Sequence, residues 1–192
     1  MATNPFTTIR ASAGSANNSM AWYQEQIRSL SAASLRPNNL LQNAPQLTTT
    51  ILPGAMYLFL YDAKHKDILP HWDRFPLVLP FRLLNDGFLG INFHYMPYIM
   101  RFKLLEKLHN FANNKTINEK TRVKVSWQLL EGMTTIAPIK ACVKHYLTSH
   151  VQSKFLNIRY PDWVTAALLP VERFVGAPKT TVWKISKETM DG

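Results

Sequence analysis

The sequence predicts an α+β fold in which a small antiparallel β-sheet or partial barrel packs with several helices behind an extended N-terminal arm. Residues 1–50 are rich in Ser, Asn and Thr and hold few apolar runs. Residues 53–95 alternate apolar stretches with turn signals, which is typical of strands. Later segments repeat apolar residues at helical spacing. We therefore expect an arm with a short helix over residues 1–50 and a single α+β domain over residues 51–192.

The composition suits one compact domain without membrane or disulfide chemistry. Of the 192 residues, 46% are apolar and only 18% are charged, below the usual level of about 25%. No stretch approaches the roughly 20 apolar residues of a membrane span, and the N-terminal residues do not resemble a secretory signal. The single cysteine, Cys142, cannot form an internal disulfide, and we expect it to be a buried small hydrophobe.

The N-terminal region contains one clear helix signal. Ser19 can cap a helix in which Trp22 or Tyr23, Ile27 and Leu30 recur at helical spacing. A short helix with a large aromatic pair can dock on its own domain or on a neighbouring subunit. The candidate partner-binding residues are Trp22, Tyr23 and Ile27.

The central region predicts a set of antiparallel strands. Residues 55–61 form an apolar run that indicates a strand. Residues 68–81 are extended, and their prolines favour an edge or a loop over a central strand. The sequence at 85–87, Asn-Asp-Gly, is a strong tight-turn signal, and residues 88–95 indicate the next strand.

The second half of the chain predicts helices. The helix over 98–110 would bury Leu104, Leu105 and Leu108 and turn its basic residues outward. We expect further helices over residues 118–130, 138–146, 162–168 and 178–186, and a return strand around Phe155 and Ile158.

Positive charge is concentrated in one segment. The net charge is +10, and residues 101–160 hold eleven basic and three acidic residues, a net charge of +8. Such a face can attract nucleic acid or an acidic protein surface, although solvated side chains on helix faces explain it equally well. The candidate contact residues are Arg101, Lys103, Lys107, Lys120, Arg122 and Lys124.

Catalytic and ligand-binding motifs are absent from the sequence. It has no Gly-rich phosphate loop, no nucleophile elbow and no spaced zinc ligands. Asp73 and Arg74 beside Trp72 favour a structural ion pair, and His94 a packed or hydrogen-bonded histidine. We therefore expect no catalytic residue, no metal and no cofactor, and we interpret the chain as a non-enzyme.

Several strings resemble a known group of phage proteins. These are PGAMYLFLYDAKHKDILPHWDRFPLVLPF, DGFLGINFHYMP, RFKLL, AWYQEQIRSL, KHYLTSHVQSKFLNI and LLPVERF, in this spacing. The chain thereby resembles small virion structural proteins of T4-like tailed bacteriophages. This resemblance implies a particle protein that is made in the cytoplasm of the host bacterium, and it assigns no catalytic or binding residue.

The sequence is compatible with three functions. The first is a structural component of the phage tail or baseplate that contacts other virion proteins in a symmetric hetero-oligomeric assembly. The alternative is a DNA-associated phage protein, such as a DNA end-binding or head-completion factor, which uses residues 101–160 for non-specific contact with DNA. The third is a small nuclease or hydrolase, which would require the fold to bring acidic or histidine residues such as Asp73 and His94 together.

Overall fold

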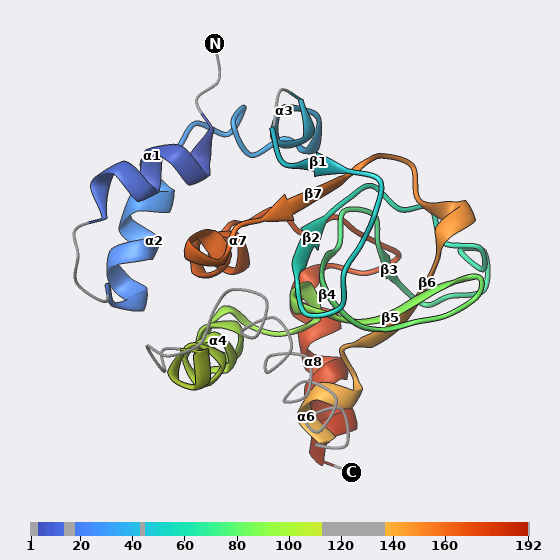
Figure 1. Cartoon of the computed structure of the whole chain (residues 1–192). Helices are drawn as coiled ribbons and strands as arrows, with labels where there is room; N and C mark the ends of the chain where they lie inside the picture. The colour runs from blue at the N-terminus through green and yellow to red at the C-terminus, as the bar shows by residue number, and fades with distance from the viewer. Residues whose placement is uncertain (1–3, 14–17, 43–44, 113–136, 192) are drawn as a thin grey trace.

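A computed structural model describes residues 4–13, 18–42, 45–112 and 137–191 (Figure 1). The helices are α1 (Pro5–Ser12), α2 (Met20–Arg28), α3 (Pro37–Leu41), α4 (Tyr98–Ala112), α6 (Ala137–Lys140), α7 (Trp163–Leu168) and α8 (Lys179–Asp191). The strands are β1 (Leu47–Thr48), β2 (Met56–Leu58), β3 (Trp72–Asp73), β4 (Leu77–Leu83), β5 (Gly87–Asn92), β6 (Val143–Leu147), β7 (Phe155–Ile158) and β8 (Phe174–Val175). The short 3₁₀ turns are η1 (Phe93–Tyr95), η2 (Thr148–His150) and η3 (Tyr160–Asp162).

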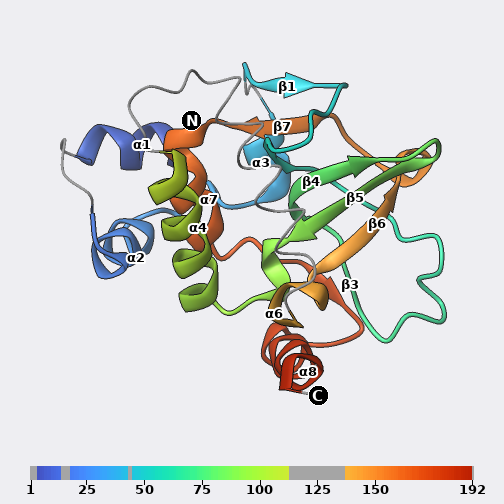
Figure 2. The same cartoon turned by 60° about the horizontal axis from the view of Figure 1, so that its bottom comes forward.

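The sheet confirms the α+β class. Six antiparallel strands lie in the order β1-β7-β2-β4-β5-β6, and β3 pairs separately with β8. The larger sheet is open, so it is not a closed barrel. Helices α1, α2, α4 and α7 gather to one side of it, and α6 lies beside α8 (Figures 1 and 2). None of the described helices is both long and apolar enough to cross a bilayer.

The hairpin of β4 and β5 lies in the middle of the sheet, where the prolines suggested an edge. Pro80 pairs with Gly90 inside the ladder, immediately before a register shift that ends at Arg82. Proline cannot donate a hydrogen bond to a neighbouring strand, and sheets tolerate it at such irregularities. The Pro80 carbonyl still accepts a hydrogen bond from the Gly54 N–H at 2.8 Å. An interior strand is therefore compatible with this proline.

Alternating side chains place the core on both faces of the sheet. Met56 and Leu58 face a large aliphatic cluster that includes residues of α4, α7 and α8. Tyr57 and Phe59 point to the opposite face, into an aromatic cluster. The Phe59 ring lies 5.0 Å from Phe155 and 5.4 Å from Tyr146, both edge-on, an arrangement that aromatic rings prefer.

The N-terminal residues include helices where we predicted an extended arm with one short helix. Asn4 caps α1 by accepting a hydrogen bond from the Phe6 N–H at 3.0 Å, and Pro5 occupies the first turn. Phe6 and Ile9 are buried in the aliphatic cluster. Helix α2 begins after Ser19, as predicted. The division of the chain into regions at residue 50 stays a prediction.

One predicted helix is wrong and another lies outside the described residues. The helix expected over 138–146 ends at Lys140, and Val143–Leu147 forms β6 instead. Pairing with β5, from Ile91↔Val143 to Gly87↔Leu147, overrides the local helical spacing. The helix expected over 118–130 belongs to the segment that the structure does not describe.

The tight turn before β5 depends on close strand contact. A Cβ atom on Gly87 would lie 1.9 Å from the backbone oxygen of Tyr146 on β6. We predict that Gly87→Ala lowers the free energy of unfolding by about 1–3 kcal/mol, because β5 and β6 must move apart. Thr148→Ala, at a nearby exposed position, is the control. Urea denaturation checks this, and equal stability of the two variants would contradict it.

Candidate functional site

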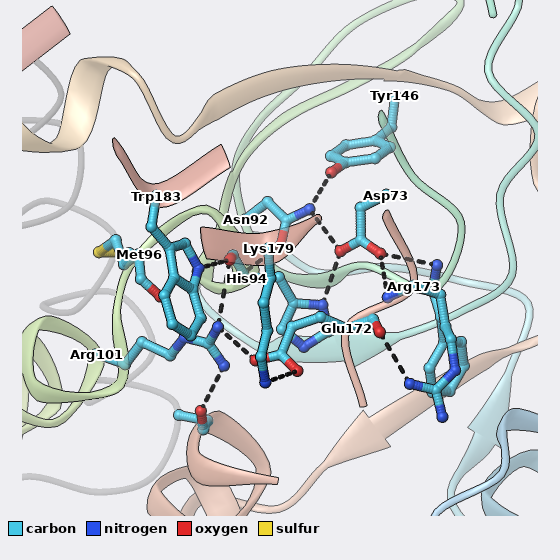
Figure 3. A network of polar contacts seen from close by, with 12 residues as sticks. Asp73, Asn92, His94, Met96, Arg101, Tyr146, Glu172, Arg173, Lys179 and Trp183 are labelled. Atoms are coloured by element: carbon cyan, nitrogen blue, oxygen red, sulfur yellow. Dashed lines mark hydrogen bonds and ion pairs between the residues drawn. The ribbon is translucent and has the colours of Figure 1, made fainter. Parts of the chain in front are cut away.

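A buried network of polar side chains begins at the carboxylate of Asp73 (Figure 3). Its Oδ2 contacts Nδ1 of His94 at 2.7 Å and accepts a hydrogen bond from Asn92 Nδ2 at 3.1 Å. Its Oδ1 accepts from the N–H groups of Phe75 and Arg173. Asn92 also donates to the Tyr146 hydroxyl at 3.0 Å. Asp73 therefore joins β3, the end of β5, η1 and the segment before β8.

The guanidinium of Arg101 forms the other half of the network. It donates to the carbonyl oxygens of Met96, Ala167 and His94 and to Glu172 Oε1 at 2.7 Å. The Trp183 indole also donates to the His94 carbonyl, at 2.8 Å (Figure 3). Arg101 is fully buried, and these contacts link α4 to α7, α8 and η1.

Opposite charges hold both buried carboxylates in their ionised form. Burial favours a raised pKa for Asp73, but the His94 ring and the hydrogen bonds to the carboxylate outweigh it and lower the pKa. Burial also favours a raised pKa for Glu172, and Arg101, His94 and Lys179 together bring it below the ordinary value. The network therefore neutralises charge inside the core.

One residue of the predicted basic surface, Arg101, is buried, so this part of the prediction is wrong. Arg101 cannot contact a partner, because its side chain is enclosed on all sides. Lys103 and Lys107 on the same helix are exposed, as predicted. Lys120, Arg122 and Lys124 lie outside the described residues. The prediction that Arg101 faces outward is therefore wrong, and its spacing of three, four and seven residues from Leu104, Leu105 and Leu108 is the signal that could have indicated its burial.

An open pocket of about 710 Å³ shares residues with this network. Its lining comes from the chain before β3, from β3 itself, from the end of α6, and from β6 and α8. Asp73 and Tyr146 of the network belong to the lining. Six basic or imidazole side chains also line it, namely Lys64, His65, His71, Lys140, Lys144 and His145.

Lys144 is the most unusual cation of the pocket. Its Nζ donates to the Ala141 carbonyl at 2.9 Å and lies 4.2 Å from the centre of the Tyr95 ring. Burial lowers the pKa of this ammonium group, with a smaller opposing effect from Cys142. Burial and the charge of Lys144 also lower the pKa of His71, whose ring lies 5.7 Å from Tyr95. The pocket thus contains two groups, the Lys144 ammonium and the His71 ring, whose charged forms are disfavoured by burial.

Other side chains singled out in the sequence are structural. Asp73 and His94 meet, but both side chains are essentially inaccessible, and Arg74 is exposed and not the partner of Asp73. Cys142 is buried, and burial raises the pKa of its thiol to about 12, so it is not a ready nucleophile. Within the described part of the chain, no three His, Cys, Asp or Glu residues are grouped as metal ligands.

The predicted partner-binding residues pack within the chain. Ile27 is buried in the aliphatic cluster, and Trp22 and Tyr23 are half-buried against it, with their rings 5.0 Å apart. Helix α2 contacts α7. Binding of a partner through the parts of Trp22 and Tyr23 that remain exposed stays a prediction.

The fold and the site define a strongly basic α+β protein whose cation-lined pocket opens beside a buried ionic network. The sequence model of one protein family, the phage T4 terminal DNA protecting protein, matches residues 7–187. The chain therefore belongs to this family. No curated protein and no solved structure matches it.

Membership of this family confirms the resemblance to proteins of T4-like phages at the level of the phage group. The assignment to the tail or baseplate is wrong, because the matched family is that of a terminal DNA protecting protein. The predicted partners in a tail or baseplate are therefore not supported. The alternative, a DNA-associated phage protein, agrees better with the family.

Loss of the Arg101 charge should destabilise the fold. We predict that Arg101→Met lowers the free energy of unfolding by about 3–5 kcal/mol, because it leaves the Glu172 carboxylate buried without its main partner. Lys103→Met, at an exposed position of the same helix, should change the free energy of unfolding by less than about 0.5 kcal/mol. Chemical denaturation of both variants checks this. An Arg101→Met protein as stable as Lys103→Met would contradict it.

Acid should weaken the network. The lowered pKa of Asp73 stabilises the fold above the ordinary carboxyl pKa of about 4, and this stabilisation is lost as the pH falls through the folded-state pKa. We predict that Asp73→Asn is less stable than the parent by about 1–3 kcal/mol at neutral pH and loses less stability on acidification. Urea denaturation between pH 7 and pH 3 measures both, with Asp67→Asn, at an exposed position outside the network, as control. An unchanged pH dependence in Asp73→Asn would refute the assignment.

Proposed function

We propose that this protein binds the ends of linear DNA and shields them from exonucleases, without catalysing a reaction on the DNA. The observation that carries the proposal is the family match over residues 7–187, since the family description is that of a terminal DNA protecting protein. Protein made in the bacterial cytoplasm would meet both phage DNA ends and host nucleases there.

The distribution of charge supports binding to DNA. Three acidic side chains, Asp73, Asp162 and Glu172, are buried, and each is paired with a basic residue or histidine inside the fold. Among the described Lys and Arg residues, only Arg101 is classed as buried. The buried pairs compensate charge inside the fold, and nearly all the described basic side chains of this chain of net charge +10 remain at least partly exposed, which attracts the phosphate backbone.

Binding to DNA without catalysis agrees with the burial of the acid–base pair that Asp73 and His94 form. Asp73 and His94 contact each other as a catalytic acid–base pair would, but both side chains are almost completely buried. Both Asp73 oxygens are also occupied by hydrogen bonds. The pair supports the fold and the lining of the pocket.

The proposal predicts protection that depends on ends. The full-length protein should slow the digestion of a linear duplex by an end-dependent exonuclease. It should leave cleavage of a covalently closed circle of the same sequence by an endonuclease almost unchanged. Densitometry of the remaining DNA over time measures both reactions. Equal binding to linear and closed circular DNA, or no protection of the linear duplex, would overturn the proposal.

Charge reversal tests whether the exposed face of α4 contributes. Lys103→Glu with Lys107→Glu should weaken binding to linear DNA by about tenfold or more at low salt and reduce its salt dependence. Arg28→Glu with Arg36→Glu makes the same change of net charge on exposed residues of the N-terminal region. If both double variants lose affinity equally, net charge alone matters and α4 is not a specific contact.

A further inference from the structure

One cation of the pocket, Lys144, has no counter-ion among the described residues. Its side chain is partly buried, and its ammonium group contacts one carbonyl oxygen and the face of the Tyr95 ring. Within the described residues, no carboxylate lies within ion-pair distance of its ammonium group. A desolvated ammonium group gains much from an anion that enters the pocket beside it.

One ring nitrogen of His71, in the same pocket, also has no hydrogen-bond partner among the described residues. Nδ1 of His71 is buried and makes no hydrogen bond to the described residues. His71 and Lys144 both line the pocket and both lie against Tyr95, whose ring centre is 5.7 Å from the His71 ring and 4.2 Å from Lys144 Nζ. A buried ring nitrogen of this kind usually has a hydrogen-bond partner, and a bound ligand can supply it.

The remaining charges of the pocket leave it receptive to an anion. Lys64 and Lys140 are exposed in the lining, and neither forms an ion pair with another of the described residues. The two acidic side chains of the lining already have partners, since Asp73 contacts His94 and Asp86 contacts His145 at 3.1 Å. The free cations therefore outnumber the free carboxylates.

The chemistry of a DNA end fits these cations. A terminal phosphate monoester carries a charge of about −1.5 to −2 at neutral pH, whereas each phosphodiester inside a strand carries one negative charge. The volume of about 710 Å³ lies within the range of about 300–1,000 Å³ that is common for small-ligand pockets. It can admit the last nucleotide of a strand but not a double helix.

We propose that this pocket binds the 5′-phosphate at a DNA terminus, with Lys144 as its central cation and Lys64 and Lys140 at its edge. The inference rests on the proposed function and adds the chemical group that distinguishes an end from the interior of a strand. The His71 ring lies beside the same anion and is positioned to donate to it through Nδ1.

Calorimetric titration of the full-length protein tests the site. The probes are a short single-stranded thymidine oligonucleotide with a 5′-phosphate and the same oligonucleotide with a 5′-hydroxyl. The phosphorylated probe should bind about tenfold more tightly, because it adds charge-assisted hydrogen bonds. Lys144→Met keeps the apolar stem of the side chain and should abolish the preference.

Two further variants keep the test decisive. Lys140→Met, at an exposed position of the lining, should reduce the preference for the phosphorylated probe. Because Lys140 is exposed, this variant tests the site without changing a side chain that packs inside the fold. Lys154→Met, exposed and outside the pocket lining, should retain the preference. Equal binding of the two probes to the parent protein, or a preference that survives both Lys144→Met and Lys140→Met, would overturn the inference.

The outcomes separate this inference from the proposed function. Equal binding of the two probes together with intact protection from exonuclease would remove the phosphate site and leave end protection standing. A strong preference for the phosphorylated probe without protection of a linear duplex would support the phosphate site and overturn the proposed protection of DNA ends.

Discussion

The ion pair between Arg101 and Glu172 is the constraint on which the arrangement of the helices depends. Taking two charges into the core is costly unless further hydrogen bonds satisfy them. Arg101 meets this requirement by donating to three carbonyl oxygens as well as to Glu172. One of these carbonyls belongs to His94, whose ring contacts Asp73. The same set of contacts (Figure 3) therefore joins α4, α7 and α8 to η1 and, through Asp73, to β3.

The use of charge inside the fold explains the character of its surface. Three of the twelve acidic residues are buried, and each is matched by a basic or imidazole group, so these charges are compensated within the fold. Lysines remain exposed on α4 and around the pocket. The core network and the proposed binding of DNA are thus two consequences of one distribution of charge.

Local patterns in the sequence predicted the fold class, the hairpin turn before Gly87 and the helix at α4, because each depends on neighbours along the chain. They failed where distant pairing decides. Residues 143–147 form a strand because they pair with β5, and the charge of the buried Arg101 is balanced by Glu172, which lies 71 residues away in the sequence. The pocket was not predicted at all, since it combines His71 with Lys144 from segments far apart. The phage strings indicated the group but could not distinguish assembly from DNA binding, which both favour basic and aromatic surfaces.

A crystal structure of the protein with a short duplex bearing 5′-phosphates tests directly whether the pocket beside Lys144 binds a DNA end. We expect the terminal phosphate within hydrogen-bond distance of Lys144 Nζ, with His71 Nδ1 alongside and the duplex outside the pocket. A terminus bound on the exposed face of α4 or elsewhere, with the pocket empty, would contradict it.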